Sequence, residues 1–171
     1  MVNGDQAKGF LQFFLGMMDS EFNTTRKVIA AVPQAKCEWR PDPKARNGLD
    51  LAWHIPTAEI FFMDGIIKGS FDMSGEEPPP PKTISEVVSF YDKNYNDRLA
   101  KLKGLSGEQL AKSLPFFGAI ELPAVMFLNF MLPHTAHHRG QLAVYLRPMG
   151  AKVPSIYGGS ADEPFQASAQ G

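Results

Sequence analysis

The chain has 171 residues, of which 44% are hydrophobic and 20% charged, enough for one domain with a hydrophobic core. Its 17 Lys and Arg and 18 Asp and Glu give a formal net charge of −1, so it lacks the basic surface of a nucleic-acid-binding protein. The single cysteine, Cys37, excludes an intrachain disulfide and fits a reducing compartment. No run approaches the ~20 apolar residues of a membrane-spanning helix. We therefore expect a cytoplasmic protein that binds neither nucleic acid nor membranes.

Two long helices are predicted in the first 70 residues. Apolar residues recur near helical spacing over residues 5–31, and Pro33 ends this helix because proline has no backbone N–H to donate. A loop rich in Pro, Gly and charged residues follows. The second helix runs from about residue 49 to 68 and ends at Gly69. His54 lies beside its apolar stripe, which consists of Leu51, Ile55, Ala58, Phe62 and Ile66.

The second half of the chain predicts two more long helices and a short one. Four prolines at residues 78–81 favour an extended connection, which we interpret as the crossover between helices. Thr83 and Glu86 form a capping box that opens a helix ending at Gly104. A short helix follows over residues 106–114, and a last long helix over about 122–146, with no strand predicted. The fold class is therefore an all-α four-helix bundle with one short extra helix.

The last helix also suggests an oligomer. Its first half is apolar on nearly every side, with Val125, Met126, Phe127, Leu128, Phe130, Met131 and Leu132 close together. A four-helix monomer would cover only about half of such a helix, so we expect a homodimer. The bundle domain is expected to span residues 1–158, and residues 159–171 form a Gly- and Ser-containing tail.

Three histidines, His54, His134 and His138, are the best candidates for a functional site. His134 and His138 are four residues apart, so their imidazoles leave the same helix face about 6 Å apart along the axis. Their stripe is apolar, and burying imidazoles without partners is unfavourable. They either coordinate a metal or are hydrogen-bonded in the core. With His54 on another apolar helix face, the pattern favours an open three-histidine site for zinc, nickel or iron.

Other catalytic templates fit less well. The HExxH zinc motif needs a glutamate where this chain has Thr135, and the Glu-x-x-His pairs of di-iron bundles are missing from the sequence. A Cys–His nucleophilic site could use Cys37, but nothing in the sequence connects it to a histidine. We therefore interpret Cys37 as an ordinary thiol.

Three neighbours of the histidine pair are candidates for supporting roles. Gln141 lies on the histidine side of the helix and could hydrogen-bond a ligand imidazole or a water on the metal. His137 lies about 100° around the helix from His138, so it should face an interface or support the site rather than share the metal. Arg139 stands among apolar residues and needs an anionic partner, for which a structural salt bridge is favoured over substrate binding.

Two segments resemble a known family. "HTAHHRGQLAVYLRPMGAKVPSIYG" resembles the C-terminal signature of the DinB-like (damage-inducible) family, and "WRPDPKARNGLDLAWHI" resembles its N-terminal half. The resemblance covers roughly residues 5–158 and is most specific in the His-Arg-Gly-Gln run. It implies a bundle with up-down-down-up topology, frequently dimeric, that holds one divalent metal on His54, His134 and His138.

The resemblance also implies a range of activities. Relatives in this family include transferases and isomerases that use low-molecular-weight thiols such as bacillithiol, mycothiol or glutathione. We therefore expect a metal-dependent thiol S-transferase that acts on a small molecule, with the thiol as cosubstrate. Metal-dependent hydrolysis is the second enzymatic candidate, because a metal on three histidines lowers the pKa of water. A non-catalytic metal- or ligand-binding dimer and a metal-free bundle with core histidines are the alternatives from other classes.

Overall fold

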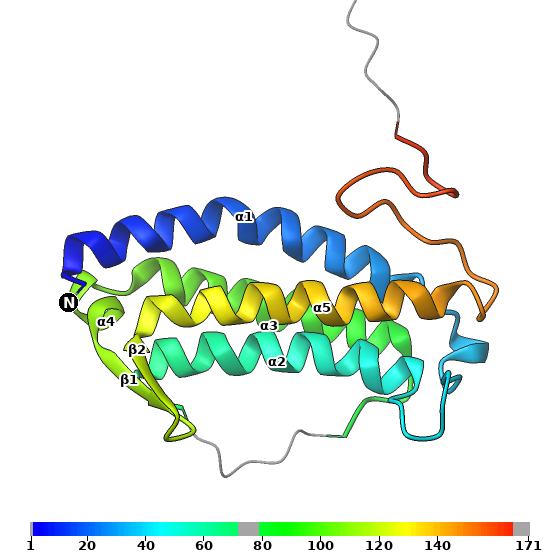
Figure 1. Cartoon of the computed structure of the whole chain (residues 1–171), viewed down its shortest axis with the longest axis horizontal. Coiled ribbons are helices and arrows are strands. Elements are labelled where there is room, and N and C mark those ends of the chain that lie inside the picture. The colour runs from blue at the N-terminus through cyan, green and yellow to red at the C-terminus, as the bar shows by residue number, and fades with distance from the viewer. Residues whose placement is uncertain (1, 72–78, 166–171) are drawn as a thin grey trace, which may run out of the picture.

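The computed structural model describes residues 2–71 and 79–165. Four long helices form a bundle: α1 (Gly4–Ala30), α2 (Gly48–Lys68), α3 (Ile84–Gly104) and α5 (Leu128–Leu146). In Figure 1, α1 and α5 run in one direction while α2 and α3 run in the other, which confirms the up-down-down-up topology. α2 packs against α3 and α5, and α1 completes the bundle by packing against the same two helices.

The helix ends follow the local sequence signals. The side chain of Asn3 caps α1 by accepting from Gln6 N–H, and Thr83 and Glu86 form the predicted capping box at the start of α3. Gly69 ends α2 in the left-handed conformation, with φ of 70°. The predicted bounds of α1, α2 and α3 lie within one residue of those observed. A 3-10 turn, η1 (Gln34–Lys36), lies in the loop between α1 and α2.

A β-hairpin between α3 and α5 corrects the sequence prediction. The short helix α4 (Gly107–Ala111) ends at Ala111 rather than at residue 114. β1 (Ser113–Phe116) pairs antiparallel with β2 (Ile120–Pro123). Phe117 and Gly118 form the turn with φ of 53° and 66°. Each strand has four residues, and only Leu114 is buried. Such short strands are too brief to show a period-two pattern in the sequence.

The last helix begins later than predicted because the hairpin occupies residues up to Pro123. A 3-10 turn, η2 (Ala124–Phe127), leads from β2 into α5. Pro78 of the four predicted crossover prolines and the last six residues of the predicted tail lie outside the described residues, and the domain boundary at residue 158 remains a prediction. None of the described helices is long and apolar enough to cross a membrane.

Two glycines let α4 lie directly against the start of α1. A Cβ built on Gly107 would stand 2.6 Å from the carbonyl oxygen of Gly4 and 2.8 Å from its Cα, closer than real atoms approach. α4 therefore packs backbone to backbone on α1, and a side chain at residue 107 would force the two helices apart.

We predict that Gly107→Ala lowers the free energy of unfolding by about 2 kcal/mol, because the clash is with backbone that cannot rotate away. Gly104→Ala is the matched control, since a Cβ there meets nothing within 4 Å. In α3 this control should leave stability unchanged or raise it by up to about 1 kcal/mol. Urea unfolding of both variants measures the difference, and equal stabilities would contradict the close packing.

Candidate metal site

The three predicted histidines come together between α2 and α5. His54 extends from α2, and His134 and His138 extend from successive turns of α5, with one nitrogen of each lying within 4.8 Å of the others. The ring centroid of His54 lies 5.1 Å from that of His134 and 4.7 Å from that of His138. The ring centroids of His134 and His138 are 4.4 Å apart. All three side chains are half-buried. Small side-chain shifts would bring these nitrogens to the ~2.1 Å bonds of a first-row metal ion.

The surroundings of the α5 histidines fit a metal ion. Nδ1 of His134 is buried and has no hydrogen-bond partner among the described residues. Burial, with smaller contributions from the nearby His138 and His54, lowers the pKa of His134 to about 4. Burial also lowers the pKa of His138. Both rings are therefore neutral at pH 7, which is the form that binds a metal.

Gln141 fixes the orientation of His138. Its Oε1 lies 3.1 Å from His138 Nδ1. An amide oxygen only accepts, so Nδ1 carries the proton and Nε2 keeps the free electron pair for a metal. The Gln141 amide donates in turn to the Tyr145 hydroxyl at 3.4 Å, and the Tyr145 ring meets Trp39 edge-on. The histidine is thus held from behind by a chain of packed side chains.

The other two supporting candidates lie away from the three nitrogens. His137 is exposed, although its ring centroid is only 4.8 Å from that of His138. Arg139 is fully buried and points to α1, where Nη1 donates to Glu21 Oε2 at 2.6 Å and to Thr25 Oγ1 at 3.1 Å. Arg139 therefore forms a structural salt bridge on the opposite side of α5 from the histidines.

A buried acid in α2 was not anticipated from the sequence. Glu59 is 2% exposed, and its carboxylate accepts from Thr135 Oγ1 at 2.6 Å and from the Tyr91 hydroxyl at 2.7 Å. Burial raises the pKa of Glu59 to about 7, although both hydrogen bonds oppose this shift. The signal was present in the sequence, because Glu59 stands four residues after Ile55 and seven before Ile66, on the apolar stripe itself.

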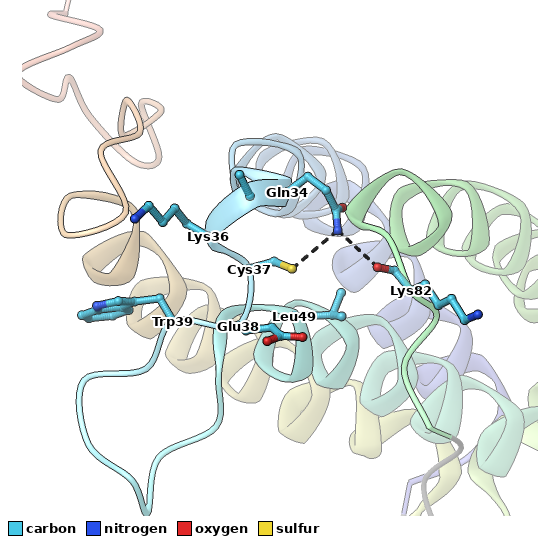
Figure 2. Close-up of a pocket in the computed structure, with 8 residues that line it drawn as sticks. Gln34, Lys36, Cys37, Glu38, Trp39, Leu49 and Lys82 are labelled. Atoms are coloured by element: carbon cyan, nitrogen blue, oxygen red, sulfur yellow. Dashed lines mark hydrogen bonds between the residues drawn. The ribbon is translucent and has the colours of Figure 1, made fainter.

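Cys37 lies in a separate pocket of about 400 Å³ whose lining contains none of the three histidines. Figure 2 shows its thiol directed at Gln34, whose Nε2 approaches Sγ at 3.6 Å and donates to the Lys82 carbonyl at 3.2 Å. Burial raises the pKa of the Cys37 thiol, so the reactive thiolate is disfavoured. The structure thus gives no support to a Cys–His nucleophilic site.

Fold and site together define a four-helix bundle with a three-histidine group able to hold a metal ion. The sequence model of the DinB family matches residues 7–167, so the chain belongs to the DinB family. Protein YrdA of Bacillus subtilis (strain 168) is 27% identical over 158 residues, covering 90% of this chain and 91% of YrdA.

Two crystal structures of DinB-like proteins have the same fold. The protein from Bacillus cereus ATCC 10987 is 26% identical, with a TM-score of 0.73 over 84% of this chain and 95% of that chain. The protein YjoA from Bacillus subtilis is 23% identical, with a TM-score of 0.67 over 86% of this chain and 96% of that chain.

We predict that Glu59 makes the stability of the metal-free protein fall as the pH rises. The pKa of Glu59 is raised from 4.5 to about 7 by folding, so the folded state holds this proton more tightly than the unfolded chain. The stabilisation is complete below pH 4.5 and is lost progressively up to pH 7, by roughly 3 kcal/mol.

The measurement is the difference in unfolding free energy between wild type and Glu59→Gln from pH 4.5 to 8. The lowered pKa of His134 makes stability rise with pH, but both proteins share this contribution, so it cancels in the difference. Glu121→Gln, the same substitution at an exposed hairpin position, is the control. A flat difference for Glu59→Gln would contradict the raised pKa.

Proposed function

We propose that this protein is a metal-dependent enzyme of the thiol S-transferase type that acts on a small molecule. The observation that carries the proposal is the convergence of one nitrogen from each of His54, His134 and His138 within 4.8 Å. Three protein ligands leave at least one coordination position of zinc, nickel or iron open for a substrate.

The charge of the site supports a thiol as the occupant of the open position. Neutral imidazoles do not offset the double positive charge of a divalent ion, so an anionic ligand is favoured there. The positive charge of Arg46 also acts on His134 and His138, where it contributes to lowering both pKa values. When bound, a divalent metal lowers the pKa of a thiol or a water at its open position to near neutrality.

The residues of the chain would have divided roles. The three histidines would hold the metal, and Gln141 would keep the proton on His138 Nδ1 so that Nε2 stays available. Glu59 is enclosed by Thr135 and Tyr91, so it is not placed to exchange protons with a substrate. Membership of the DinB family supports a low-molecular-weight thiol as the cosubstrate, in line with the resemblance described above.

Metal content is the first test. We predict near-stoichiometric zinc, nickel or iron in tag-free protein and its loss in His54→Ala, His134→Ala and His138→Ala, because each variant removes one of three ligands. His137→Ala is the matched control and should keep the metal, since His137 lies outside the group. Mass spectrometry of the purified proteins gives the stoichiometry, and a metal-free wild type after reconstitution would rule the proposal out.

The loaded protein should then be assayed with bacillithiol, mycothiol and glutathione against electrophilic small molecules. Turnover that disappears in His138→Ala would support the transferase. Hydrolysis without a thiol would favour the metal-dependent hydrolase instead. Bound metal that stabilises the fold without any turnover would favour a non-catalytic binding protein.

We further propose that the protein is a homodimer that pairs through one face, defined by Phe10, Phe13 and Met17 of α1 and Phe130 and Val144 of α5. These side chains are exposed, whereas α2 and α3 contribute no exposed large hydrophobic residue among the described residues. Phe10 and Met17 lie on the side of α1 that carries Glu21, which contacts α5. The face therefore continues from one helix to the other.

A second copy of the chain suits this face for two reasons. The only charged residue of α5 is the buried Arg139, so the α5 part of the face brings no like charges together. The face also combines protruding side chains with two positions that carry no side chain, Gly16 and Gly140, where a Cβ would meet nothing within 4 Å. A twofold interface needs both shapes on one surface.

We predict that light scattering gives a mass of twice 18.9 kDa for the wild type. Phe13→Asp should shift the protein to the monomer, because it places a charge in the middle of the apolar contact. Phe117→Asp is the control, with a similar exposed fraction, 66% against 64%, but a position on the hairpin. A monomeric wild type, or equal effects of the two variants, would refute this interface.

A further inference from the structure

One buried hydrogen bond joins the two helices that supply the histidines. Thr135 follows His134 directly in α5, and its Oγ1 donates to Glu59 Oε1 at 2.6 Å. Glu59 stands five residues after His54, in the same helix α2. The bond therefore connects α2 and α5 close to His134 in one helix and to His54 in the other.

The surroundings of this bond make it hard to replace. The second oxygen of Glu59 accepts from the Tyr91 hydroxyl at 2.7 Å, so α3 holds the carboxylate from the other side. Thr135 and Tyr91 are fully buried and Glu59 nearly so. Loss of either partner would leave a buried carboxylate oxygen unpaired, which is strongly unfavourable.

Apolar contacts alone do not determine how two helices lie along each other. Hydrophobic burial has no direction, so α5 could slide or rotate against α2 with little change in buried area. A hydrogen bond to a buried carboxylate has a required length and direction. Because Thr135 and His134 are adjacent, a rotation of α5 that breaks the bond also changes the position of His134 relative to His54.

We propose that Glu59 is a positioning residue for the metal site, which fixes the register of α2 against α5 through Thr135. Glu59 does not contact the metal, and the proposal rests on the proposed function. A second buried threonine provides a comparison. Thr25 in α1 accepts from Arg139 Nη1 at 3.1 Å and so ties α5 to a helix that carries none of the three histidines.

The test compares Thr135→Val with Thr25→Val. Both threonines are fully buried, and valine keeps the shape while removing the hydroxyl. The affinity for Zn²⁺, measured by competition with a chelator, should fall about tenfold or more in Thr135→Val and change little in Thr25→Val. Both variants should lower the melting temperature, so stability alone does not separate them. Equal zinc affinities in the two variants would overturn the proposal.

Two substitutions of Glu59 separate the hydrogen bond from the charge. Gln keeps an oxygen that accepts from Thr135 and an amide that donates to the Tyr91 hydroxyl, whereas Leu has neither. Glu59→Gln should therefore keep wild-type zinc affinity and the wild-type absorption bands of bound Co²⁺. Glu59→Leu should lose both. If Glu59→Leu fails to fold, the threonine pair still decides. Zinc affinity lost in Glu59→Gln as well would contradict a role through hydrogen bonding.

A metal-free measurement distinguishes failure of this proposal from failure of the proposed function. Spin labels are attached to cysteines introduced by Lys68→Cys in α2 and Asn129→Cys in α5, where both native side chains are exposed. The substitution Cys37→Ser removes the native thiol, so the labels report the distance between α2 and α5. Thr135→Val should shift or broaden this distance distribution, and Thr25→Val should not. A wild type that binds no zinc would refute the proposed function, and the distance distributions would then decide the role of Glu59. An unchanged distribution in Thr135→Val would overturn that role.

Discussion

The pairing of α2 with α5 is the constraint on which the rest of this structure depends. A three-histidine group drawn from two helices exists only while those helices keep one relative position, since neither helix alone carries three ligands. The other elements pack around these two helices. α3 packs against α2, α1 packs against both α3 and α5, and the hairpin lies at one end of the bundle (Figure 1).

The buried polar side chains lie where α5 meets its two neighbours, α2 and α1, and where α2 meets α3. Thr25, Glu59, Thr135 and Arg139 are the buried polar or charged residues of the described chain. Each is bonded to a residue of another helix. Buried charges contribute little net stability, because their desolvation offsets much of the attraction. The hydrogen bonds of these residues nevertheless require particular distances and directions. They therefore favour one arrangement of the helices among others that would bury a similar apolar area.

The sequence contains strong signals for the helices and for the histidines, and weaker ones for what surrounds them. Capping residues such as Thr83 and the i, i+4 spacing of His134 and His138 are local, so they can be recognised without the fold. The hairpin is too short to show its period, and its turn depends on positive φ at Phe117. The partner of Glu59 is Thr135, 76 residues away, and only the packing of α2 on α5 shows that the two meet. Long-range pairs of this kind have no signature in a single sequence.

The salt bridge between Glu21 and Arg139 also has a consequence for the order in which the protein can fold. The two residues are separated by 118 positions, and Tyr157 joins them from still further along the chain. During synthesis, α2 and α3 can pair early, since they follow one another in the chain. The side of α1 that carries Glu21 has to wait on the ribosome until nearly the whole chain has emerged. α1, although made first, therefore completes its burial only once α5 and the segment around Tyr157 have been made.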